Sequence, residues 1–123
     1  MAKTILIIDD DPDWVRMLSM RLQHEGYQVE AAFDAIQAVS QTIKLKPDLV
    51  LLDIMMPAGS GVGVLKNLRE NVKTFNVPVI VLTGISDEQT KEAAEKLGIS
   101  GYFMKPVDMD KLIEKLKEVL IKQ

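Results

Sequence analysis

The chain has 123 residues, of which 47% are hydrophobic and 27% are charged, and its formal net charge is −3. These values fit one globular domain with one core, and they give no electrostatic footprint for nucleic acid or an anionic membrane. There is no cysteine, which excludes disulfides, a thiolate nucleophile and a zinc–cysteine site. The apolar run near the start is too short for a signal peptide, and no stretch approaches the roughly 18 apolar residues of a membrane helix. We therefore expect a soluble cytoplasmic domain without nucleic-acid or membrane partners.

Short apolar runs alternate five times along the chain with amphipathic stretches. The runs, which are typical of β-strands, lie at residues 4–8, 27–32, 49–52, 77–82 and 101–104. The amphipathic stretches predict helices over about residues 13–25, 34–45, 62–71, 87–97 and 108–120. Asp11 before Pro12 is typical of a helix start, and Gly26 of a helix end. Ser86 and Gln89 have the spacing of a capping box before the fourth helix.

This alternation predicts an α/β fold. Strands of continuous apolar residues need cover on both faces, which favours a parallel sheet with helices on each side. Right-handed crossovers leave few topologies, and we expect the order 2-1-3-4-5. The fold class is thus a flavodoxin-like, doubly wound (βα)5 domain over residues 1–123.

Three carboxylates should converge at the carboxyl edge of this sheet. Strands 1 and 3 are neighbours in the expected order and flank the position where ligands bind. Asp9 and Asp10 follow strand 1, and Asp53 follows strand 3. Carboxylates this close repel one another unless a cation neutralises them. Oxygen ligands without histidine or cysteine point to Mg²⁺, with Mn²⁺ or Ca²⁺ also possible.

The ends of strands 4 and 5 supply groups that suit a phosphoryl ligand. Thr83 and Gly84 offer a hydroxyl and an accessible backbone N–H, and Lys105 offers an ammonium. Asp53 lies centrally among these donors, which predicts an aspartyl-phosphate site. Taken singly, each residue has a structural reading: a strand-end threonine, a solvated lysine, or acids at a helix N-terminus. Together they favour the phosphoryl site.

The same residues carry a resemblance to a known family. Over essentially its whole length the chain resembles the receiver domain of two-component response regulators. The resemblance rests on four motifs: "DD" at 9–10, "LLDIMMP" at 51–57, "VLTG" at 81–84 and "GYFMKP" at 101–106.

The resemblance implies a role for each acidic residue. Asp53 would accept a phosphoryl group from a histidine kinase or a histidine phosphotransfer protein. Asp10 and Asp53 would bind Mg²⁺ together with the backbone carbonyl of Met55, and Asp9 would assist through water. Such a domain is a phosphorylation-dependent signalling switch and not an enzyme acting on an external substrate.

The resemblance also implies the parts of a switch. Lys105 would pair with the phosphoryl group and Thr83 would hydrogen-bond it, while Tyr102 would swing inward when Thr83 moves. The peptide bond between Lys105 and Pro106 would be cis. The output would be a changed surface on helix 4, strand 5 and helix 5, read by a downstream effector protein or by an output domain outside this sequence.

Two other functions compete with this interpretation. A phosphohydrolase of the haloacid-dehalogenase kind also uses an aspartyl phosphate, but it needs a second aspartate at the position of Met55 and a cap domain. A protein-binding module that no longer phosphorylates is disfavoured by the full set of acceptor, metal and lysine residues. The chain ends just after the last predicted helix, so it is either a stand-alone receiver or part of a longer protein.

Two further hypotheses concern apolar residues near the site. Trp14, at the start of the first helix, either covers the core or contacts a partner, and Met17 and Pro106 are further candidates for that contact. Met55 and Ile85 would obstruct the water that attacks the acyl phosphate, which would prolong the phosphorylated state.

Overall fold

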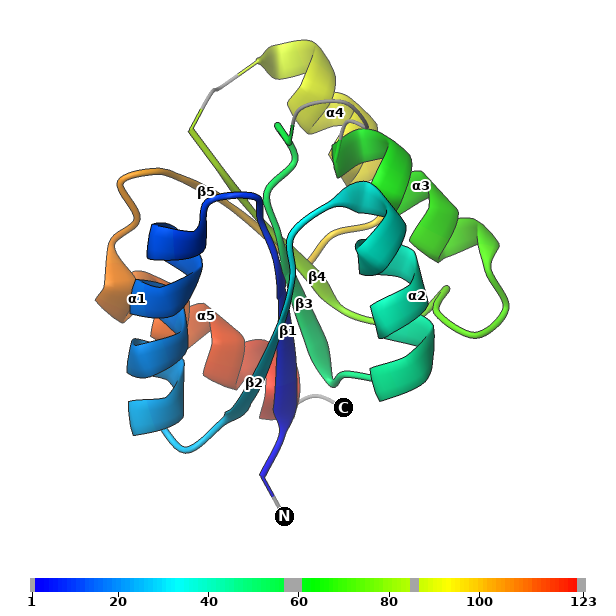
Figure 1. Cartoon of the computed structure of the whole chain (residues 1–123). Coiled ribbons are helices and arrows are strands. Elements are labelled where there is room, and N and C mark those ends of the chain that lie inside the picture. The colour runs from blue at the N-terminus through cyan, green and yellow to red at the C-terminus, as the bar shows by residue number, and fades with distance from the viewer. Residues whose placement is uncertain (1, 57–60, 85–86, 122–123) are drawn as a thin grey trace.

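The computed structural model describes residues 2–56, 61–84 and 87–121. Across these residues strands and helices alternate (Figure 1). The strands are β1 (Thr4–Ile8), β2 (Gln28–Ala32), β3 (Leu49–Leu52), β4 (Val79–Thr83) and β5 (Gly101–Met104). The helices are α1 (Pro12–His24), α2 (Ala35–Leu45), α3 (Gly61–Glu70), α4 (Glu88–Leu97) and α5 (Met109–Ile121). Among the helices so described, none has both the length and the apolar character needed to cross a membrane.

The strands form one parallel sheet in the order β2-β1-β3-β4-β5, which confirms the predicted topology. β1 and β3 are direct neighbours, with Ile5 opposite Leu49 and Ile8 opposite Leu52. The residues that follow β1 and β3 therefore leave the sheet side by side at its carboxyl edge.

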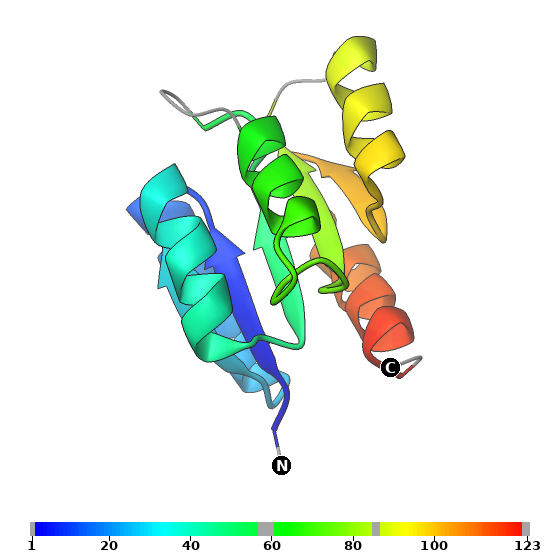
Figure 2. The same cartoon turned by 90° about the vertical axis from the view of Figure 1, so that its right-hand side faces the viewer.

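The sheet is covered on both faces, as its apolar strands require (Figures 1 and 2). α1 and α5 cover one face, where Leu18 and Leu22 pack with Leu116 and the odd-numbered residues of β1 and β3. α2, α3 and α4 cover the other, where Ala38, Leu68 and Ala94 pack with the even-numbered residues. We call these the α1/α5 layer and the α2/α3/α4 layer. Alternate strand residues thus supply two separate cores on one sheet.

The helix boundaries follow the local chemistry, with one correction. Asp11 caps α1 as predicted, because its carboxylate accepts the N–H groups of Asp13 and Trp14. Gly26 follows the end of α1 with a φ of 98°, which suits glycine. The predicted capping box at Ser86 is wrong for the start of α4. The cap is Asp87, whose Oδ1 accepts the N–H of Gln89 at 3.0 Å; Ser86 itself lies outside the described residues.

Candidate functional site

Asp9 and Asp53 are fixed by backbone hydrogen bonds that continue the ladder beyond β1 and β3. The N–H of Asp9 donates to the carbonyl of Ala32 at 3.1 Å, and that of Asp53 to the carbonyl of Ile8 at 2.9 Å. Asp9 is 2% exposed and Asp53 is 9% exposed, whereas Asp10 is exposed. One carboxylate oxygen from each of these three residues lies within 4.8 Å of the others. The predicted convergence of Asp9, Asp10 and Asp53 is therefore present in the structure.

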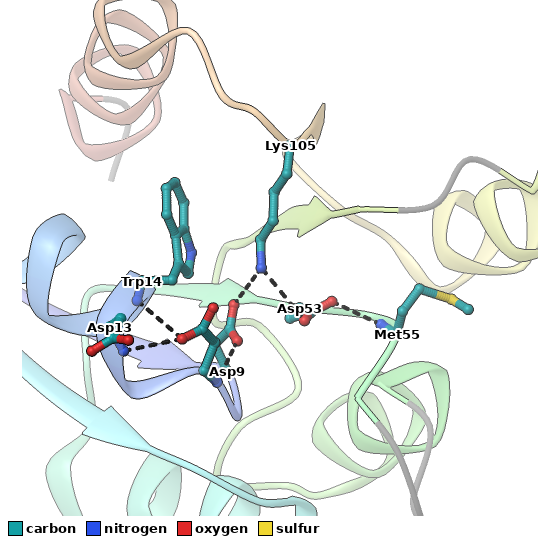
Figure 3. Close-up of polar contacts among 7 residues, drawn as sticks. Asp9, Asp13, Trp14, Asp53, Met55 and Lys105 are labelled. Carbon is teal, nitrogen blue, oxygen red and sulfur yellow. Dashed lines mark hydrogen bonds and ion pairs between the residues drawn. The ribbon is translucent and has the colours of Figure 1, made fainter.

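Lys105 reaches into this cluster from the loop between β5 and α5 (Figure 3). Its backbone N–H donates to the carbonyl of Thr83 at 2.7 Å, and the Lys105–Pro106 peptide bond is cis, as predicted. Its Nζ lies 2.8 Å from Oδ2 of Asp9 and 3.6 Å from Oδ2 of Asp53. Asp9 is thus the nearer partner, a preference the sequence did not predict. The other oxygen of Asp9 is engaged by the N–H of Asp11 at 3.0 Å, which leaves Oδ2 for the ammonium.

The surroundings of Asp53 disfavour the ionised form of its carboxyl group. Burial raises the pKa of the Asp53 carboxyl, and the charges of Asp9 and Asp10 raise it further. The N–H of Met55, which donates to Oδ1 of Asp53 at 2.9 Å, and the charge of Lys105 act the other way without cancelling the rise in pKa. For Lys105, burial lowers the pKa, but the hydrogen bond to Asp9 and the charges of Asp9 and Asp53 outweigh it, so its pKa is raised and the ammonium is retained.

The acidic cluster fits a hard divalent cation. Its donors are all carboxylate oxygens, which suit Mg²⁺ better than softer metals. Two of the carboxylates are buried, while Asp10 is exposed and leaves a side open to solvent. A cation here would offset the repulsion that raises the pKa of Asp53. The fit rests on these side chains; the carbonyl of Met55 stays a predicted ligand.

Thr83 and Tyr102 lie on the strands next to the acidic cluster. Thr83 ends β4 and is fully buried. Tyr102 on β5 pairs with Val81 and packs against the α2/α3/α4 layer, with the Nζ of Lys91 5.5 Å from its ring centroid. Its hydroxyl is buried and has no hydrogen-bond partner among the described residues. The roles of Thr83 as a phosphoryl donor and of Tyr102 as a switch stay predictions.

Two features of the site were not predicted. The ring centroid of Trp14 lies 5.2 Å from the Nζ of Lys105, and the side chain is half-buried and packs on the α1/α5 layer. The prediction that Trp14 covers the core is therefore confirmed, and partner contact stays a prediction for Trp14, Met17 and Pro106. Gly61, at the start of α3, packs so tightly beneath the site that an added Cβ would lie 2.6 Å from the carbonyl oxygen of Asp53. Nothing in the sequence pattern signals either contact, because both join residues that are not neighbours in the sequence.

Known proteins similar to this chain agree on one family. The family described as "Response regulator receiver domain" matches residues 5–117. The DNA-binding dual master transcriptional regulator RpaA of Synechocystis sp. is 35% identical over 116 residues, which are 94% of this chain and 48% of that protein. The phosphate regulon transcriptional regulatory protein PhoB of Pseudomonas aeruginosa is 35% identical over 120 residues, which are 98% of this chain and 52% of that protein. The chain thus spans about half the length of these curated relatives.

A solved structure agrees as well. The response regulator receiver domain protein (CheY-like) from Methanospirillum hungatei superposes with a TM-score of 0.92 at 30% identity, covering 99% of this chain and 96% of that one. The family match, the sequence identities and the shared fold cover the same residues that build the acidic edge of the sheet. The chain belongs to the receiver domain family of two-component response regulators.

Proposed function

We propose that this receiver domain accepts a phosphoryl group on Asp53 from a histidine kinase or a histidine phosphotransfer protein, in a reaction that requires Mg²⁺. The observation that carries the proposal is the setting of Asp53. Its buried carboxylate has one oxygen held by the N–H of Met55 and the other 3.6 Å from the ammonium of Lys105, next to two further acids.

The proposed step is a displacement at phosphorus. A carboxylate oxygen of Asp53 forms the new O–P bond while the bond from phosphorus to the donor's imidazole nitrogen breaks, and the imidazole leaves with the electron pair. Lys105 attracts the incoming phosphoryl oxygens, and the hydroxyl of Thr83 donates to one of them. Asp10, Asp53 and the carbonyl of Met55 would hold Mg²⁺, with Asp9 assisting through water. When bound, this ion supplies the positive charge that lets an anionic donor approach three acids.

The proposed output is a change in the surface formed by α4, β5 and α5. Thr83 moves toward the phosphoryl group and Tyr102 turns inward after it, which alters what a partner meets on this face. The partner is a downstream effector protein or an output domain of a longer chain. We place this signalling in the cytoplasm, where histidine kinases supply the phosphoryl group.

Intact mass measured after incubation with acetyl phosphate and Mg²⁺ tests the proposal. The wild type should gain one phosphoryl group, and Asp53→Asn should gain none. Asp13→Asn is the matched control, since its carboxylate is highly exposed on α1 and pairs with Arg16. A wild type that gains no mass, or an Asp53→Asn protein that still gains it, would refute the proposal; the former would favour a binding module without phosphorylation.

A further inference from the structure

We propose that Trp14 is a positioning residue for Lys105: the face of its ring keeps the ammonium over the acidic site while the phosphoryl group arrives. This inference rests on the proposed phosphorylation of Asp53. It assigns a role to a residue outside the set of acids, threonine and lysine that the family motifs mark.

The turn that begins α1 positions both Asp9 and Trp14, the two residues that contact Lys105 from this helix end (Figure 3). The carboxylate of Asp11 accepts the N–H of Trp14 at 3.3 Å and so fixes the start of α1. The N–H of Asp11 in turn donates to Oδ1 of Asp9 at 3.0 Å. Asp9 and Trp14 are therefore placed by the same residue, and both face the Nζ of Lys105, at 2.8 Å from the carboxylate oxygen and 5.2 Å from the ring centroid.

The ring of Trp14 continues to attract the ammonium of Lys105 when the ammonium moves. In the resting structure Lys105 lies nearer to Asp9 than to Asp53. To pair with a phosphoryl group on Asp53, the ammonium must leave its short contact with Asp9. A carboxylate contact is lost over a short displacement, whereas the face of an indole attracts a cation out to about 6 Å from its centroid. Trp14 thus limits how far the flexible lysine side chain strays during the transfer.

The contact depends on the face of the ring and not on the indole N–H. The Nε1 of Trp14 is buried and has no hydrogen-bond partner among the described residues. Phenylalanine should therefore replace Trp14 with little loss, because it keeps an aromatic face. Leucine should not, because it fills space against the α1/α5 layer but offers no π-face to the cation.

The rate of phosphorylation by acetyl phosphate, followed by intact mass at saturating Mg²⁺, tests this. Trp14→Leu should slow the reaction about threefold to tenfold, and Trp14→Phe should stay within about twofold of the wild type. Met20→Leu, at a position of α1 that is 65% exposed, is the control and should match the wild type. In a Lys105→Met background, Trp14→Leu should cause no further slowing, because the ring acts through the ammonium.

The outcomes separate this inference from the proposed function. A wild type that takes up no phosphoryl group defeats the proposed function. If the wild type is phosphorylated and Trp14→Leu reacts equally fast, or is slowed equally without Lys105, the positioning role is wrong. Trp14 is the only tryptophan of the chain, so a further readout needs no Trp14 variant: Lys105→Met should change the tryptophan emission, and unchanged emission would overturn the contact itself.

Discussion

At the scale of single residues, the surroundings of Asp53 disfavour its ionised form, although the proposed phosphoryl transfer needs that form. Burial and the neighbouring charges of Asp9 and Asp10 raise its pKa, while the pKa of Lys105 is raised and its ammonium persists. One lysine cannot neutralise three carboxylates. We therefore expect a cation bound at this cluster to stabilise the folded domain.

Asp53→Asn should therefore make the metal-free domain more stable at neutral pH. Because the pKa of Asp53 lies above its ordinary value of 3.8, the folded protein binds this proton more tightly than the unfolded chain does. That stabilisation is complete below the ordinary pKa and is lost as pH rises through the folded value. Asparagine has no such proton to lose, so the variant keeps its stability as pH rises, and thermal unfolding at pH 7 monitored by circular dichroism should show a higher midpoint for the variant.

With Mg²⁺ added, the wild type should become more stable than Asp53→Asn. At about 100 times its dissociation constant a ligand stabilises the folded state by about 2.7 kcal/mol, which the wild type should gain and Asp53→Asn should largely lack. Asp13→Asn, which removes a highly exposed carboxylate, serves as control and should respond to Mg²⁺ as the wild type does. An Asp53→Asn protein that gains as much from Mg²⁺ as the wild type would exclude Asp53 as a ligand.

We expect Met55 to affect how long the proposed phosphorylated state lasts. Its side chain is 39% exposed and lies two residues after Asp53, where it can cover the approach of water. Met55→Asn should accelerate phosphate release about fivefold, because an amide can hold a water by a hydrogen bond of roughly 1 kcal/mol. Phosphate release timed after acetyl-phosphate loading measures this, and Met55→Leu should leave the rate unchanged. Ile85, the second residue of this hypothesis, lies outside the described residues.

At the scale of elements, Arg69 ties α3 to the end of α4. Its guanidinium donates to the carbonyls of Leu97 and Gly98, at 3.2 Å and 2.8 Å, and to that of Phe75 at 3.1 Å. Burial lowers the pKa of Arg69. The last carbonyls of a helix have no partner within it, so this side chain completes the C-terminus of α4.

Arg69→Met should loosen α4 more than any other helix. It keeps the aliphatic bulk but leaves these carbonyls without their donor, and we expect a loss of about 2–3 kcal/mol in the free energy of unfolding by urea. Amide hydrogen exchange should accelerate first in α4. Arg16→Met is the matched control: its ion pair with Asp13 at 3.2 Å is 75% exposed on the arginine side, and its loss should cost less than about 0.5 kcal/mol. Equal losses in the two variants would contradict this role for Arg69.

The elements were predictable where local chemistry decides them. β1, β3 and β5 begin and end at the predicted residues, because apolar runs bounded by polar or glycine residues leave little freedom. The sequence pattern does not identify the cap of α4, because Ser86 and Asp87 are both good capping residues. The hydrogen bond from Arg69 to Leu97 joins residues 28 positions apart in the sequence, and the periodicity of apolar residues does not predict such a contact.

The site was predictable to the level of which residues meet, and not of how they pair. Parallel strands bring their carboxyl ends to one edge, which is enough to gather Asp9, Asp53 and Lys105. The closer pairing of Lys105 with Asp9 depends on which carboxylate oxygen the N–H of Asp11 already occupies. The contact with Trp14 depends on the angle at which α1 leaves the sheet, which packing of the whole layer decides.

At the scale of the whole molecule, one sheet carries two cores, and the described part of the chain should unfold as one unit. Leu68 of the α2/α3/α4 layer and Leu116 of the α1/α5 layer are both fully buried, on opposite faces. Both layers pack on the same strands, so loss of packing in one layer exposes strands on which the other layer also depends. Trp14, the only tryptophan, packs on the α1/α5 layer and reports on that side alone.

Leu68→Ala should therefore lower the free energy of unfolding measured by the fluorescence of Trp14, although Leu68 and Trp14 lie on opposite faces of the sheet. Removing a buried leucine side chain costs 2–5 kcal/mol, and we expect about 3 kcal/mol in urea, with the same midpoint by tryptophan fluorescence and by circular dichroism. Leu116→Ala should give the same coincidence, and Ile36→Ala, at an 85% exposed position of α2, should change stability by less than about 0.5 kcal/mol. If Leu68→Ala moved the circular dichroism transition and left the fluorescence transition in place, the two layers would be separate units. In that case the sheet would be too weak a link to carry a change from Asp53 to the α4–β5–α5 surface, because that surface draws its elements from both layers.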